Sequence, residues 1–207
     1  MTVPSQLASA HGRRDEVPNQ ELAIFIVKNK DKNAVKELVE NLTNKSKGIQ
    51  SDCIKVLYEI GESEPSMIAD YTKDFITLLD SKNNRMIWGA VSAIHSITLT
   101  NPHEIFKALP KIMDTANNGS VITKDQTVGI LIKLCSLNEF LPSAFPLLIE
   151  IITTCPTNQL PMYAENAMPI INSKNKDLFI KTLLSRLDEI EKDTKRIRVE
   201  KVIKKLG

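Results

Sequence analysis

Three histidines and three cysteines are the side chains in this 207-residue sequence that could bind a metal ion or act as nucleophiles. They are His11, His95, His103, Cys53, Cys135 and Cys155. A metal site needs such ligands in clusters, whereas these six are scattered and form neither a C-x-x-C pair nor an H-E-x-x-H motif. An odd number of cysteines also argues against a disulfide framework. We therefore predict no metal, no cofactor and a reducing compartment.

Catalytic loops are also missing from the sequence. It contains no glycine-rich phosphate-binding motif and no G-x-S-x-G turn that would present a nucleophilic serine. Cys53 and Cys135 fall on or beside core-facing helical positions, without a basic neighbour that would lower the thiol pKa, so they are predicted to pack as small hydrophobes. His95 is predicted to lie exposed on a helix. We therefore predict a protein that is not an enzyme.

Composition and charge place the chain among globular proteins. Hydrophobic residues make up 42% and charged residues 25% of the sequence, and the formal net charge is only +2. Residues 191–207 hold seven Lys/Arg against three acidic residues, so the basic character is local. No run approaches 18 apolar residues, and residues 1–20 lack the apolar core of a signal peptide. The expectation is a cytoplasmic protein.

One helical face recurs every 37 residues. The recurring positions are Cys53, Ala90, Thr127 and Ala164, then Leu57, Ile94, Leu131 and Met168, then Ile60, Ile97, Leu134 and Ile171. Within each segment the three positions are spaced i, i+4 and i+7, which is one side of an α-helix. All are small or apolar, so the spacing predicts a series of helices that each bury this side.

A second amphipathic run precedes each of these helices, so the repeating unit is a helix, a turn and a second helix. Such a pair leaves apolar surface exposed until neighbouring pairs stack on it. The prediction is an all-α chain of about five helix pairs with an N-terminal capping helix. The repeats are expected at about 32–61, 67–99, 104–138, 142–172 and 177–206, within one domain of residues 19–207 that follows a flexible tail of residues 1–18.

The segment LLDSKNNRMIWGAVSAIHSI, residues 78–97, resembles a HEAT repeat of the HEAT and armadillo-like class. The features it shares are a Leu-Leu-Asp end of the first helix, an Asn-containing turn and an Arg that opens the second. Asp80 and Arg85 would be the characteristic pair, which the other repeats do not keep. Pro110 and Pro146 fall inside first helices, where HEAT repeats tolerate a proline. The resemblance implies a right-handed α-solenoid in which the second helices line a concave groove.

The groove-facing side of the predicted second helices mixes aromatic, aliphatic and few charged residues, a composition that suits protein recognition. The predicted partner-binding residues are Lys55, Tyr58, Arg85, Trp88, Ser92, His95, Asp125, Ile132, Met162 and Asn166. Trp88, the only tryptophan, either anchors a ligand or packs between repeats. The predicted function is a scaffold that binds a protein or peptide in this groove, and homo-oligomerisation through the groove is a variant of it.

The basic C-terminal helix raises a different function, nucleic-acid binding. Its candidate anion-binding residues are Lys195, Arg196, Arg198, Lys201, Lys204 and Lys205. A similar solenoid groove occurs in the HEAT-like alkylpurine DNA glycosylases, which this alternative would resemble. Phosphate binding needs positive charge along the contacting face, however, and here it gathers at one end. The sequence gives no membrane-binding element.

Overall fold

The computed structural model describes residues 2–13 and 15–207, and within them the chain is helical without a β-strand. Residues 1–127 and 128–207 form two compact units, and the boundary falls inside helix α8. The sequence predicts one repeat domain over 19–207 and gives no sign of this boundary. The boundary lies in repeat three, where α8 runs continuously and no proline or glycine cluster marks a linker.

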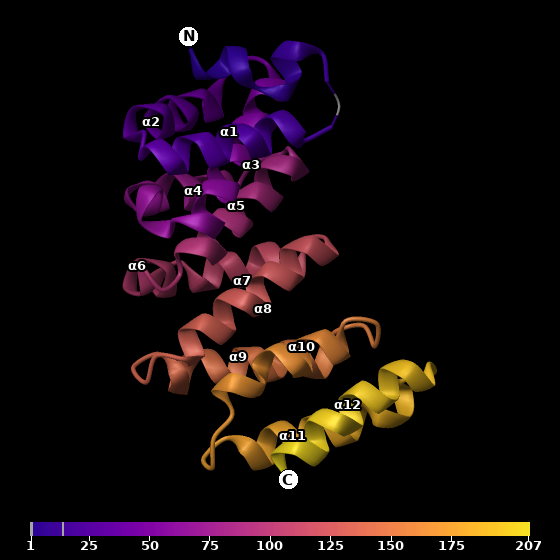
Figure 1. The fold of residues 1–207 in the computed structure, drawn as a ribbon. Coiled ribbons are helices and arrows are strands. Elements are labelled where there is room, and N and C mark those ends of the chain that lie inside the picture. Colours follow the sequence, from indigo (N-terminus) through magenta and orange to yellow (C-terminus); the bar gives the residue numbers. More distant parts are fainter. Residues whose placement is uncertain (1, 14) are drawn as a thin grey trace. The chain divides into compact units, whose positions relative to one another are not determined.

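The first unit is built from layers of helices (Figure 1). The helices are α1 (Val17–Asn29), α2 (Lys32–Glu40), α3 (Lys47–Ser63), α4 (Thr72–Leu78), α5 (Asn84–Ile97), α6 (Pro102–Lys107), α7 (Leu109–Asn117) and the start of α8 (Val121–Cys135). Helix α3 packs against α1, α2 and α5, while α4 packs against α5. Helices α3 and α5 are therefore each enclosed by the first helix of their own repeat and by the neighbouring repeat.

The second unit contains two further helix pairs. Its helices after α8 are α9 (Leu141–Thr154), α10 (Leu160–Ala167), α11 (Lys176–Arg186) and α12 (Asp193–Leu206). Helix α11 packs against α9 and α12, and α10 packs against α12. The prediction of an all-α chain of about five helix pairs is confirmed.

The core follows the 37-residue pattern. Cys53, Leu57 and Ile60 on α3 are fully buried, as are Ala90, Ile94 and Ile97 at the equivalent positions of α5. Burial of a leucine or isoleucine side chain, such as Leu57 or Ile94, contributes roughly 1.5–3 kcal/mol to folding. The columns read from the sequence therefore mark the interior of the first three repeats, whereas in the fourth only Ala164 is fully buried, because α10 ends before the partly buried Met168 and Ile171.

One of the two prolines predicted inside first helices lies there, and the other does not. Pro146 lies inside α9, as the resemblance implies. Pro110 does not, because the first helix of repeat three is split into α6 and α7, and Pro110 sits in the first turn of α7. A first-turn proline loses no helical hydrogen bond, since that N–H has no partner within the helix.

The N-terminal segment is folded against the first repeat, unlike the flexible tail predicted for residues 1–18. Residues Val3–Gln6 and Ala8–His11 form two 3-10 helices, and Leu7 between them is fully buried. The Ser9 backbone N–H donates to Asp52 Oδ2 of α3 at 2.7 Å. Apolar contact and long-range hydrogen bonds thus hold a segment whose local composition resembles a tail.

Helices α3 and α5 approach closely because a glycine stands at their contact. A Cβ atom at Gly89 would lie 2.5 Å from Cγ1 and 2.9 Å from Cγ2 of Ile54. Ile54 is itself buried and β-branched, so its side chain has few alternative rotamers. The helix spacing in the first unit therefore depends on the missing side chain at residue 89.

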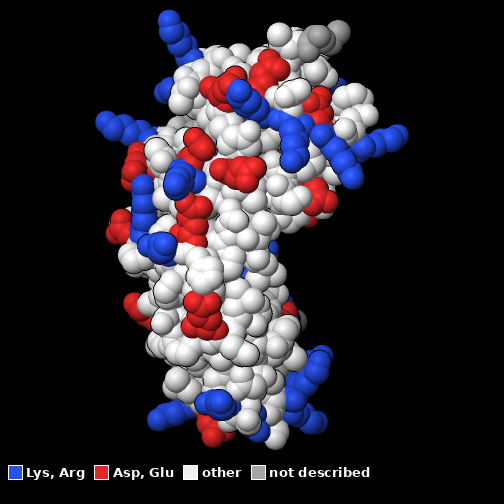
Figure 2. All heavy atoms as spheres, turned by 90° about the vertical axis from the view of Figure 1, so that its left-hand side faces the viewer, with Lys and Arg blue, Asp and Glu red and all other residues white. Residues whose placement is uncertain are grey.

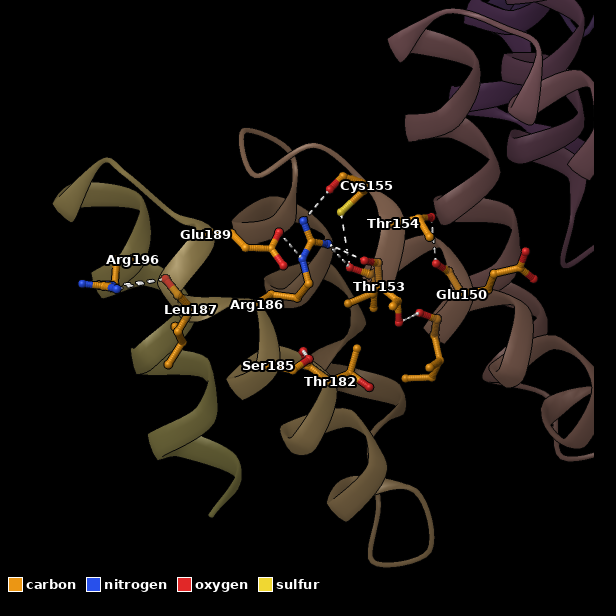
Figure 3. A network of polar contacts seen from close by, with 12 residues as sticks. Glu150, Thr153, Thr154, Cys155, Thr182, Ser185, Arg186, Leu187, Glu189 and Arg196 are labelled. Atoms are coloured by element: carbon orange, nitrogen blue, oxygen red, sulfur yellow. Dashed lines mark hydrogen bonds and ion pairs between the residues drawn. The ribbon is translucent and has the colours of Figure 1, made fainter.

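Arg186 ties the two helix pairs of the second unit together (Figure 3). It is 6% exposed, and its guanidinium donates to the carbonyl oxygens of Ile152 and Thr153 at 2.8 Å and of Cys155 at 2.9 Å. Glu189 accepts from Arg186 Nε at 2.7 Å. The last carbonyls of a helix lack intrahelical donors and carry partial negative charge, so a cation from α11 satisfies the end of α9.

Gly89→Ala should lower the free energy of unfolding by about 1–2 kcal/mol, because overpacking opposes the small gain in helix propensity. Ile54→Ala removes the two closest atoms. In urea unfolding, Gly89→Ala combined with Ile54→Ala should therefore be less destabilising than the sum of the single changes by about 1 kcal/mol. Additive effects of the two substitutions would show that the helices do not meet in this way.

Arg186→Met should destabilise the protein by about 2–4 kcal/mol, because it leaves three carbonyls of the α9 end without their donor. The matched control is Arg196→Met on α12. The Arg196 side chain is less buried, and its Nε and Nη2 atoms lie 3.2 Å from Leu187 O. Urea unfolding followed by circular dichroism should give a much smaller loss for the control. Equal losses would contradict the role assigned to Arg186.

Candidate functional site

A cleft of about 560 Å³ opens between α3 and α5 within the first unit. We call it the α3–α5 cleft. Its walls come from α3, α5, the start of α8 and the N-terminal segment. The lining residues are Ala8, Ser9, Arg13, Asp15, Glu16, Gly48, Ser51, Asp52, Ile54, Lys55, Tyr58, Arg85, Trp88, Gly89, Ser92 and Ile122. Five predicted partner-binding residues are among them, namely Lys55, Tyr58, Arg85, Trp88 and Ser92.

Lys55 is held by two carboxylates inside this cleft. Its Nζ lies 2.5 Å from Glu59 Oε1 and 2.9 Å from Glu16 Oε2, and it stands 4.6 Å from the centre of the Tyr58 ring. Burial alone would lower the pKa of Lys55, but hydrogen bonds to Glu59, Tyr58 and Glu16 outweigh burial and raise it above the ordinary lysine value. Lys55 is thus a charged residue whose charge is already compensated.

The charged side chains in and beside the N-terminal wall of the cleft also have partners within the protein. Arg13 forms an ion pair with Asp15 at 2.8 Å, and hydrogen bonding from Arg13 lowers the pKa of the Asp15 carboxyl. Asp52 accepts hydrogen bonds from Ser9 and from the side chain of Asn19. Asp15 therefore stays ionised at neutral pH, and Asp52 holds the segment against α3.

Trp88 stands between two clefts. It lines the α3–α5 cleft and also a smaller cleft of about 280 Å³ shared with Asp80, Lys111 and the start of α8. The side chain is partly buried. Trp88 is therefore neither fully packed between repeats nor fully exposed, and its role as a ligand anchor stays a prediction.

A shallower groove of about 660 Å³ adjoins the α3–α5 cleft where α3 and α5 begin. Its charged lining residues are Lys47, Lys82 and Arg85, and we call it the basic groove. All three side chains are exposed. Gly48, Ser51 and Arg85 line both hollows, so the basic groove and the cleft form one continuous surface.

Arg85 does not form the ion pair that the HEAT resemblance implies. Lys111 of α7 instead pairs with Asp80, with Nζ 2.6 Å from Oδ2. A lysine on the next first helix takes the carboxylate, so Arg85 makes no ion pair with any residue in the described ranges. This leaves its guanidinium available at the junction of the cleft and the basic groove.

The other predicted partner-binding residues do not join this cleft. His95 and Asp125 lie in the first unit, and His95 Nδ1 is 2.6 Å from Gln126 Oε1, so the imidazole links α5 to α8. Ile132, Met162 and Asn166 belong to the second unit. Ile132 and Met162 are partly buried, while Asn166 is exposed. Their role as a shared groove stays a prediction.

Three of the six candidate anion-binding residues on the basic C-terminal helix form hydrogen bonds or ion pairs with other residues of the protein. Arg198 donates to both oxygens of Glu165 at 2.8 and 2.5 Å, and this hydrogen bonding lowers the pKa of Glu165. Lys195 binds the Asn158 side chain, and Arg196 binds Leu187 O and Asp188. Lys201, Lys204 and Lys205 stay exposed on α12. Only this trio keeps the charge that motivated an anion site there.

Figure 2 shows how charge is spread over one face of the molecule. Over the first unit, at the top of this view, Lys and Arg are interspersed with Asp and Glu. A polyphosphate chain favours a continuous positive surface. The face drawn in Figure 2 does not offer one along the first unit.

None of the three cysteines lines these hollows. Cys53, Cys135 and Cys155 are all buried, and burial raises the pKa of Cys53 and of Cys135 to about 12. Across residues 2–13 and 15–207, His, Cys, Asp and Glu side chains do not gather into a group that could hold a metal ion. Nor is any helix there long and apolar enough to cross a membrane.

Several residues of the site were not singled out from the sequence. Ser9, Arg13 and Glu16 fall within the predicted tail, and Lys47, Lys82 and Ile122 are not among the predicted site residues. The spacing of Val3, Leu7 and Ala8, all buried, is the signal that could have placed the N-terminal segment against the repeats. Nothing local signals that Lys47 and Lys82 converge, because they are 35 positions apart and meet only when the repeats stack.

Comparisons with known proteins identify the fold. The sequence matches no protein-family model and no curated protein. A designed armadillo repeat protein in complex with the peptide (KR)4 is similar at a TM-score of 0.67 and 16% identity, over 91% of this chain and 87% of that one. A structure of computationally designed armadillo repeat proteins for modular peptide recognition is similar at a TM-score of 0.67 and 14% identity, over 99% of this chain and 98% of that one. The chain thus has the all-α solenoid fold of the armadillo/HEAT-like helical repeat proteins.

Proposed function

We propose that this protein is a scaffold that binds a peptide or an exposed segment of another protein in the α3–α5 cleft. The observation that carries the proposal is the convergence of α3, α5 and the start of α8 on one cleft beside Trp88. A partly buried tryptophan that keeps an open face offers large contact area at a low cost in conformational entropy.

The chemistry of the cleft supports recognition rather than reaction. Lys55, Arg13 and Asp15 are engaged in ion pairs, so they shape the walls and are not poised to transfer protons. The cleft combines aromatic side chains of Tyr58 and Trp88 with hydroxyl groups of Ser51 and Ser92. Apolar anchors surrounded by a few polar groups are typical of peptide-binding surfaces.

The similar designed proteins add a second line of support. One is described in complex with a peptide, and others were made for modular peptide recognition. Both statements concern those proteins, and at 14–16% identity they transfer a scaffold and not a ligand. They favour a peptide over a small molecule as the occupant proposed for this cleft.

Selection of displayed random 12-residue peptides on the immobilised full chain tests the proposal. Trp88→Ala should weaken the selected peptides about 30-fold, which corresponds to a contact of about 2 kcal/mol. Since Trp88 is the only tryptophan, a bound peptide without tryptophan should also shift its emission in the wild-type protein.

Phe25→Ala supplies the matched control. Phe25 is an exposed aromatic residue of α1 that does not line the α3–α5 cleft, and its side chain is 57% exposed. Its loss should change peptide affinity by less than about twofold, because contacts at exposed sites contribute little. Selected peptides that bind Trp88→Ala as tightly as wild type would rule out this cleft.

A further inference from the structure

We infer that the ligand of this cleft is an acidic peptide segment, in which Asp or Glu side chains bind the basic groove and a nearby apolar side chain packs on Trp88. This inference rests on the proposed function and specifies the chemistry of the partner. It follows from which charges at the site are compensated within the protein and which are not.

The compensated charges lie in the α3–α5 cleft. Lys55 has Glu16 and Glu59, and Arg13 has Asp15. Bringing another charge to either pair would mean breaking an ion pair that is already formed, so neither cation offers much attraction to a ligand. The cleft therefore suits a neutral or apolar part of a peptide.

The uncompensated charges lie in the basic groove. Lys47, Lys82 and Arg85 are exposed, line one hollow and make no ion pair within the described part of the chain. Acidic residues are absent from the lining of this groove. Three like charges around one hollow repel each other, and a carboxylate-bearing ligand relieves that repulsion.

The starts of α3 and α5 add partial positive charge to the basic groove. Both helices begin at this groove, and a helix start carries partial positive charge. Ser81 also lines the groove, and its hydroxyl, which accepts from the Asn83 N–H, can donate to a carboxylate. These groups supplement the three cations, which supply most of the charge.

The position of the basic groove beside the cleft limits the spacing of the ligand. Lys47 and Lys55 on α3 lie eight residues apart, about 12 Å along a helix with a rise of 1.5 Å per residue. An extended peptide covers this distance in about four residues. The acidic residues should therefore lie within about four positions of the apolar anchor.

A peptide fits this surface better than a nucleic acid. A polyphosphate that continued from the basic groove into the cleft would meet Asp15, Glu16 and Asp52. A peptide can place an uncharged residue there, whereas every nucleotide carries a phosphate. The inferred ligand is also opposite in charge to the peptide (KR)4 of the similar designed protein.

The test compares peptide selection on the wild-type chain with selection on a charge-reversed variant, Lys47→Glu with Lys82→Glu and Arg85→Glu. Peptides from the wild type should be enriched in Asp and Glu within four residues of an apolar position, and the variant should bind them at least about 30-fold more weakly. Selection on the variant should instead enrich Lys and Arg. Binding of the acidic peptides should weaken as salt rises.

The matched control reverses the same amount of charge elsewhere, with Lys201→Glu, Lys204→Glu and Lys205→Glu on α12. It should leave the affinity of the acidic peptides within about twofold, because α12 contributes no residue to the groove. Because all six lysines and arginines are exposed, both variants should unfold close to the wild-type temperature. Arg85→Gln, a milder change, should weaken the acidic peptides about tenfold.

The outcomes separate the two proposals. Selected peptides that depend on Trp88 but carry no acidic bias, or carry a basic one, would overturn the inference and leave the peptide-binding function standing. If no peptide depends on Trp88, both fail. Displacement of the acidic peptides by single-stranded oligo-dT at equal charge would point to a nucleic-acid ligand and overturn the inference.

Discussion

The close approach of α3 and α5 at Gly89 and Ile54 is the constraint on which the core and the cleft of the first unit both depend. A helix pair of this size cannot cover its own apolar side, so α3 and α5 must approach closely enough to bury the Cys53 and Ala90 positions. The absent side chain at residue 89 makes that approach possible. Gly89 and Ile54 also line the α3–α5 cleft, so the contact that closes the core sets the floor of the binding surface.

Polar contacts with the backbone complete what apolar packing begins. Asn101 donates to Ala69 O at 2.7 Å and to Thr72 Oγ1 at 2.8 Å, which joins repeat three to repeat two. Arg186 does the same for α9 and α11 through three carbonyl oxygens. Helix ends buried between repeats need such donors and acceptors, because water cannot reach them.

The sequence predicts the repeated core well because burial has a local period. A helical face that is buried in every repeat must be apolar in every repeat, so Leu57 and Ile94 are visible as one column. The sequence predicts the contacts of Arg186, Asn101 and the N-terminal segment poorly. Their partners lie 29 to 43 positions away, and a hydrogen bond to a backbone carbonyl leaves no trace in the residue type of the acceptor.

The candidate site shows the same limit in terms of charge. Trp88 and Tyr58 could be placed on the open side of second helices from register alone, whereas the net charge at the cleft depends on which ions are paired. The richest basic run, on α12, is partly compensated by Glu165 and Asp188, while Lys47, Lys82 and Arg85 are sparse in sequence but gathered in space. Since the scaffold fixes only where side chains point, repeat proteins of one fold can carry binding surfaces of opposite charge.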